Sequence, residues 1–171
     1  MLNEFLADRR AAILDRWLSL ILDTYPSEVG RFLRKEKDRF ANPVGQTIAR
    51  EIEAIYDGIL RGAEPDELAP ALDGIVRIRA VQDFRPSQAV SFMFLLKRAV
   101  REDLEEVRRG EPLPPELFPL ESRIDALAVR AFDIHSECRE KMYEIRAKEI
   151  KNRTWVLLER MNRAGGKGDD G

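Results

Sequence analysis

Apolar residues recur every three or four positions along almost the whole chain, and the alternation typical of strands is nearly absent. The spacing predicts an all-α protein with helices over about 2–22, 27–35 and 43–61, another opening at Pro65, and one over 86–108. The helix that begins at Pro86 is apolar on nearly every side, so we expect it at the centre of the core. The predicted fold is a single helical bundle.

The last predicted helix is unusually long. Residues 119–162 contain no glycine and no proline after Pro119, and 44 helical residues extend roughly 66 Å. The residues before them would form a globule roughly 35 Å across, so we expect this helix to extend beyond the globule. One sensory or regulatory domain is predicted over 1–163, and the Gly- and Asp-rich stretch 164–171 is predicted to be a disordered tail.

Two apolar groups lie on this helix. The first half carries a seam spaced 4, 3, 4, 3, 4, which is the spacing of a coiled coil. It consists of Leu120, Ile124, Leu127, Ala131, Ile134 and Cys138. A basic stretch follows, and then the apolar residues Trp155, Val156, Leu157, Leu158 and Met161. We expect the seam from Ile124 to Cys138 to hold a homodimer, and Trp155, Val156, Leu158 and Met161 to contact a partner protein.

Charge, apolar run length and cysteine content together argue against several functional classes and locations. Charged residues make up 35% of the chain, but the net charge is only -2, which argues against a nucleic-acid binder. No apolar run is long enough to insert across a membrane, and the N-terminus lacks the apolar core of a secretory signal. With one cysteine and no intramolecular disulfide possible, we expect a cytoplasmic protein.

No arrangement of residues predicts catalysis, so we expect a protein that is not an enzyme and uses no cofactor or metal. His135 and Cys138 share a helix face, but two ligands do not make a zinc site. The alternative is a ligand sensor, with His135 as the axial ligand of a haem. In another form of that alternative, a small apolar ligand binds in the core beside Phe92, Met93, Phe94 and Leu96.

Two polar junctions separate predicted helices. Asn42 and Pro43 have the residue types of a helix cap and first turn. The second junction, between the helices that flank residue 84, contains Arg79, Gln82, Asp83, Pro86 and Ser87. Such groups cap helix ends and brace neighbouring helices, and Asp83 is placed to accept N–H bonds at a helix start. The same junction is also suited to binding a small ligand.

These junctions resemble motifs of the RsbRD N-terminal domain family. The similar segments are FANPVG at 40–45, IRAVQDF at 78–84 and PSQAV at 86–90, and the likeness covers roughly residues 11–139. The family takes its name from co-antagonists of the RsbT kinase in the bacterial stress-signalling complex. The resemblance implies an all-α sensory input domain, globin-like without haem, that dimerises and passes its state along a terminal helix.

The resemblance also implies how the protein acts. In the co-antagonists the long helix leads into a STAS domain that bears the phosphorylated residues, whereas this sequence ends at Gly171. We therefore expect a stand-alone regulatory module in stress-response signal transduction, acting on a separate signalling protein that supplies the output. The resemblance carries over no catalytic residue.

Overall fold

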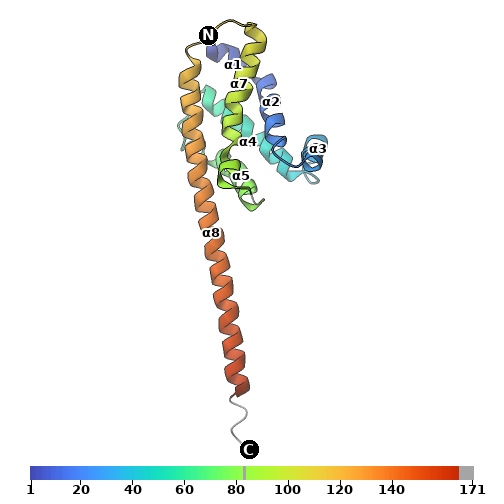
Figure 1. Ribbon diagram of the computed structural model, residues 1–171, viewed down its shortest axis with the longest axis vertical. Helices are drawn as coiled ribbons and strands as arrows, with labels where there is room; N and C mark the ends of the chain where they lie inside the picture. Colours follow the sequence, from blue (N-terminus) through green and yellow to red (C-terminus); the bar gives the residue numbers. More distant parts are fainter. Residues whose placement is uncertain (83, 166–171) are drawn as a thin grey trace, which may run out of the picture. The chain divides into compact units, whose positions relative to one another are not determined.

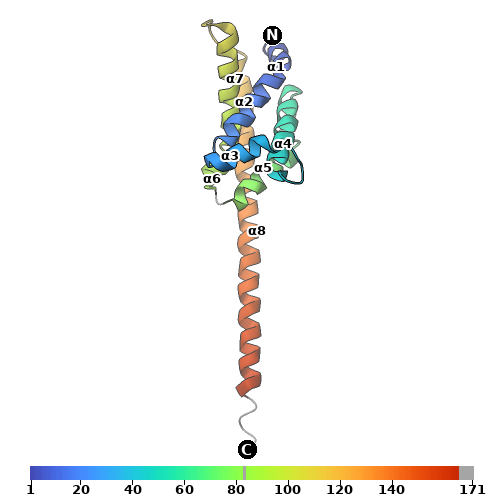
Figure 2. The same cartoon turned by 90° about the vertical axis from the view of Figure 1, so that its right-hand side faces the viewer.

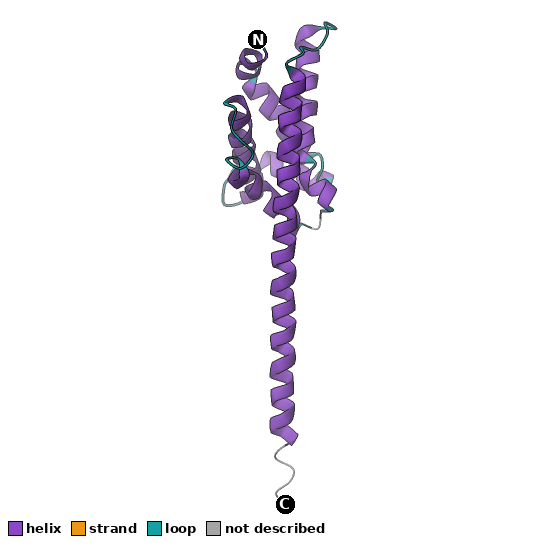
Figure 3. Ribbon diagram, turned by 90° about the vertical axis from the view of Figure 1, so that its left-hand side faces the viewer, coloured by secondary structure: helices purple, strands orange, loops and turns teal. Residues whose placement is uncertain are grey.

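A computed structural model describes residues 1–82 and 84–165, and within these ranges it contains eight helices and no strand (Figure 3). The all-α prediction is therefore confirmed. The helices are α1 (Leu2–Asp8), α2 (Arg10–Leu22), α3 (Ser27–Lys35), α4 (Pro43–Leu60), α5 (Ala69–Val81), α6 (Pro86–Val90), α7 (Phe92–Arg108) and α8 (Leu117–Gly165). Residues 166–171 of the predicted disordered tail, and Asp83, lie outside the described residues.

The chain divides into two compact units, Met1–Ser136 and Glu137–Gly171. In the first unit α2 packs against α7 and α4 packs against α5, and the first turns of α8 contribute to the same core (Figures 1 and 2). Trp17 and Phe92 are among its largest fully buried side chains. The helix α8 (Leu117–Gly165) contains 49 residues, which confirms the predicted long C-terminal helix.

Two of the predicted helices are interrupted. The first is divided at Arg9, where φ is -96° and ψ is 8°, and the helix from Pro86 is divided at Ser91. Neither position carries Gly or Pro, so no local signal marks the breaks. At Arg9 the side chain reaches α7 and donates two hydrogen bonds to Asp103, from Nε at 2.9 Å and from Nη2 at 2.7 Å. A tertiary contact thus accompanies the first break.

The ion pair of Arg9 and Asp103 is strongly asymmetric, because the carboxylate is fully buried whereas the guanidinium side chain remains 38% exposed. We expect Arg9→Met to lower the melting temperature at least about twice as much as Asp103→Asn, since an unpaired buried charge is the costlier state. Thermal unfolding of both variants at neutral pH measures the difference. Equal losses would mean that the buried carboxylate gains little from its pairing.

The seam on the first half of α8 lies in the core of the first unit. Ile124, Leu127, Ala131 and Ile134 are buried there, and Cys138, in the second unit, is half-buried. Burial within one protomer leaves the four core residues no free surface for a second copy. The expectation that they form a dimer contact is corrected accordingly, because heptad spacing fits any apolar helix partner, including the chain's own bundle.

The helix α7 is also less completely buried than its composition predicts. Phe92, Met93 and Leu96 are buried in the core, whereas Phe94 is 48% exposed. Arg98 and Arg101 follow Phe94 on the same side of α7 and are also exposed. The helix therefore has a solvent-exposed face, and this face begins within its apolar stretch. Phe94 therefore belongs to the surface of the first unit rather than to a ligand pocket in its core.

Candidate interaction surface

The C-terminal part of α8 exposes a dense group of large apolar side chains. The predicted contact residues Trp155, Val156, Leu158 and Met161 are between 41% and 68% exposed. Upstream, Tyr143, Ile145 and Ile150 are also exposed. Single exposed apolar residues are common on protein surfaces, whereas large contiguous groups are typical of surfaces that bind other molecules.

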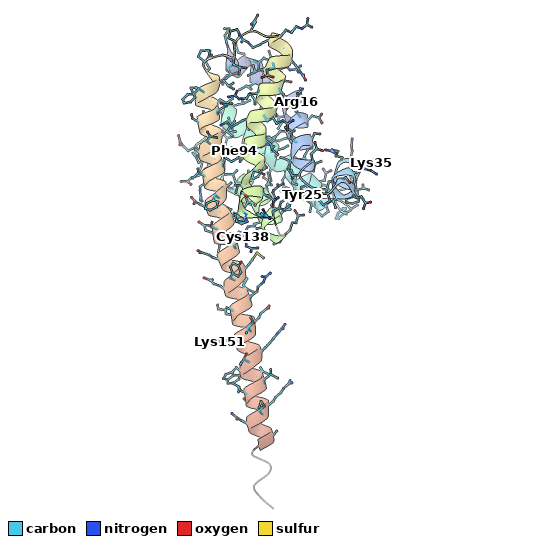
Figure 4. All side chains as sticks on the ribbon, in the orientation of Figure 1. Arg16, Tyr25, Lys35, Phe94, Cys138 and Lys151 are labelled. Carbon is cyan, nitrogen blue, oxygen red and sulfur yellow. The ribbon has the colours of Figure 1, made fainter. Side chains whose placement is uncertain are left out.

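Basic residues surround this apolar group. Between residues 146 and 163 there are six basic and only two acidic side chains, although the whole chain carries a net charge of -2. Figure 4 shows Lys151 projecting from the helix, and its side chain is exposed. Among the described residues of this segment one ion pair forms, between Arg163 and Glu159 on successive turns of the helix. The segment therefore presents apolar and cationic surface together.

A second exposed apolar group lies on the first unit. Ion pairs from Lys97 to Asp125 at 2.9 Å and from Arg101 to Glu121 at 2.5 Å hold α7 antiparallel to the first part of α8. This register sets the exposed Phe94 level with residues near 128 on α8 (Figure 4). Val129 and Phe132 of α8 are exposed in that neighbourhood. We call Phe94, Val129 and Phe132 the α7–α8 patch.

The second polar junction centres on Arg79, which is fully buried in α5. Its Nη2 donates to the Gln88 carbonyl at 2.9 Å and to the Thr24 hydroxyl at 3.2 Å. The guanidinium carbon lies 4.3 Å from the centre of the Phe84 ring and 5.6 Å from that of Tyr25. Burial lowers the pKa of Arg79 from its ordinary value, and the aromatic faces offset part of that cost.

The remaining junction residues divide between bracing and exposed positions. The Tyr25 hydroxyl donates to Gln82 at 3.0 Å, which ties the end of α2 to the end of α5, and burial raises the pKa of the Tyr25 phenol. Pro86 and Ser87 open α6 and are exposed. The predicted capping role of Asp83 lies outside the described residues. Arg79 and Gln82 thus act as inter-helix braces here, beside a cleft of about 380 Å³.

His135 lies on α8 in the first unit and is 2% exposed, at the edge of the apolar seam. Among the described residues no group of three or more His, Cys, Asp or Glu side chains is placed to hold a metal ion. In the same ranges, no helix combines the length and the hydropathy that crossing a bilayer requires. The haem alternative gains no support from this setting, since the surroundings of His135 are those of a core residue.

The residues that the sequence predicts as partner contacts near the end of α8 are exposed, but the sequence pattern missed other groups. The α7–α8 patch was missed because Phe94 lies in a run so apolar that no outward face can be recognised. The setting of Arg79 was missed because Thr24 and Tyr25 are more than 50 positions away in the chain. No local pattern connects such distant residues.

One comparison with known proteins is positive. The family model described as the RsbT co-antagonist protein RsbRD N-terminal domain matches residues 11–150, which is most of the chain. No curated protein and no solved structure matches this chain, so the globin-like arrangement stays a prediction. The family's domains are sensory or regulatory parts of stress signalling. With the match spanning both polar junctions and the greater part of α8, the chain belongs to the RsbRD N-terminal domain family.

Proposed function

We propose that this protein is a non-enzymatic signalling module that forms a homodimer and acts on a separate output protein through the C-terminal part of α8. The observation that carries the proposal is the exposure of Trp155, Val156, Leu158 and Met161 on one short stretch of helix. Tryptophan and methionine are enriched where proteins meet, and burying such side chains removes large apolar areas from water.

Family membership supports the regulatory part of the proposal. The matched region ends at residue 150, so the group from Trp155 to Met161 follows it directly. A sensory domain transmits its state through the element that connects it to its output. In this chain that element is α8, and its exposed apolar end is the surface on which an output protein of the RsbT-antagonist type would bind.

Dimerisation is proposed to use the α7–α8 patch. Phe94, Val129 and Phe132 are each about half or more exposed, and they lie at one level of two adjacent antiparallel helices. When two copies associate about a twofold axis through α7 and α8, the same patch is buried on both copies, as an isologous dimer requires. The dimer contact and the partner contact then use different residues, so each can be removed separately.

Two variants of the full chain test these roles. We expect Val129→Glu with Phe132→Glu to convert a dimer into a monomer in light scattering, because burying two charges opposes association. We expect Trp155→Glu to leave the dimer intact but to abolish capture of the output protein by the tagged chain.

Circular dichroism of both variants checks that helix content is retained. A wild-type chain that is monomeric at high concentration would refute the dimer, and capture that is unchanged by Trp155→Glu would refute the proposed contact surface. The two results are independent, so one part of the proposal can fail while the other stands.

A further inference from the structure

The C-terminal part of α8 carries a second apolar seam, displaced from the first. Its members are Tyr143, Ala147, Ile150, Thr154, Leu157 and Met161, spaced 4, 3, 4, 3, 4, and all six are exposed. The one polar member is Thr154, whose hydroxyl donates to the Ile150 carbonyl at 2.9 Å. In a coiled coil, such positions alternate between the two core sites of the heptad, and each inserts between residues of a facing helix. The seam therefore has the geometry to receive one further helix along about five turns.

A row of arginines follows one edge of this seam. Arg146, Arg153 and Arg160 are seven residues apart, and each immediately precedes a seam position. In a coiled coil these are flanking positions, where side chains pair with charges on the facing helix. None of the three makes an ion pair with a described residue, so all of them present unneutralised charge along the edge.

The pattern of charges disfavours a second copy of this chain as the facing helix. In a parallel pair, Arg146 would lie opposite Lys151 of the other copy, and only one attractive pair, Arg139 with Glu144, would remain upstream. In an antiparallel pair the arginine row would face itself. Like charges at flanking positions oppose association and select partners of opposite charge.

We infer that residues 143–161 form a coiled coil with an amphipathic helix of the output protein whose flanking positions are acidic. The inference rests on the proposed function, because it states the chemistry of the partner that the C-terminal part of α8 contacts. Of the proposed contact residues, Met161 lies in the seam and Leu158 flanks it. Trp155 and Val156 lie outside the coiled-coil face and would contact other parts of the output protein. The apolar seam supplies the affinity, and the arginine row selects glutamate or aspartate on the facing helix. The α7–α8 patch is left to the homodimer.

Two synthetic peptides of about four heptads test the inference on the full chain. Both carry isoleucine and leucine at the core positions; one carries glutamate at every flanking position and the other lysine. Fluorescence anisotropy of the labelled peptides at low salt measures binding. We expect the acidic peptide to bind about 100-fold more tightly than the basic one, because several attractive pairs replace repulsive ones.

Charge reversal of the row supplies the decisive variant. We expect Arg146→Glu, Arg153→Glu and Arg160→Glu together to weaken binding of the acidic peptide about 100-fold and to strengthen binding of the basic one. The matched control changes Lys141, Lys148 and Arg163 to glutamate, which alters the net charge equally but away from the seam. In that control we expect affinity for the acidic peptide within about threefold of the wild type.

Several outcomes would overturn the inference. An acidic facing helix is excluded if the two peptides bind with equal affinity or if neither binds. It is also excluded if the charge-reversed arginine row and the control variant lose equal affinity for the acidic peptide. Binding to phosphatidylserine vesicles without binding of the acidic peptide would assign the basic surface to a membrane. Loss of the homodimer in Ile150→Glu would assign the seam to a second copy.

These results remain distinct from a failure of the proposed function. If neither peptide binds while Trp155→Glu still abolishes capture of the output protein, the acidic-helix inference fails and the contact surface stands. If capture is insensitive to Trp155→Glu, the proposed contact surface itself fails.

Discussion

Trp17→Ala is expected to lower the free energy of unfolding by about 4 kcal/mol, because it removes a large, fully buried side chain from a close-packed core. The indole Nε1 also donates to the Phe92 carbonyl at 2.7 Å, at the first residue of α7. The substitution therefore opens a cavity between α2 and α7 and removes a buried hydrogen bond between them. Urea denaturation followed by circular dichroism measures the change.

The second tryptophan provides the control. Trp155 is 63% exposed, so Trp155→Ala is expected to change the free energy of unfolding by no more than about 0.5 kcal/mol. Trp17→Phe separates the two contributions at the buried site, since it keeps most of the apolar volume while it removes the indole donor. Similar losses in Trp17→Ala and Trp155→Ala would contradict the assignment of Trp17 to the core.

Much of the fold follows from local sequence patterns. The apolar spacing predicted a helix over about 43–61, where α4 lies, and the absence of glycine and proline predicted the long α8. The break at Arg9 could not be predicted, because the backbone there departs from a helix without a residue type that requires it. At Ser91 the backbone keeps helical angles, with φ -60° and ψ -22°, so the boundary between α6 and α7 is only a local interruption that the sequence does not mark. At Arg9 the accompanying contact is with Asp103, 94 positions away in the chain.

The candidate surface was predictable only in part. Apolar residues at 155–161, after a basic stretch, already indicated an exposed contact group, and each of the four named residues is exposed. The seam from Ile124 to Ile134 was assigned to a dimer because heptad spacing does not identify the facing helix. Distinguishing the chain's own core from a second copy requires the positions of α2, α4 and α7, which periodicity along one helix does not contain.

Asn42 gives the second large stability effect expected from a single side chain. Its Oδ1 accepts from the Gly45 N–H at 2.9 Å and caps α4, and its Nδ2 donates to the carbonyls of Leu33 and Glu36 at 2.9 and 2.8 Å. The side chain is 1% exposed, so water cannot replace these bonds. We expect Asn42→Ala to lower the free energy of unfolding by about 3 kcal/mol, measured by urea denaturation.

Two further substitutions at Asn42 distinguish capping from bracing. Asn42→Ser retains a good N-cap acceptor but loses both donated bonds, so we expect a loss of about 2 kcal/mol, smaller than that of Asn42→Ala. Asn42→Asp keeps the cap and adds a charge that the helix dipole favours, yet its carboxylate would face the Leu33 and Glu36 carbonyls. If bracing dominates, the aspartate variant is less stable than the serine variant. Wild-type stability in Asn42→Asp would instead mean that the cap alone matters, and that α3 is held to α4 by its apolar contacts.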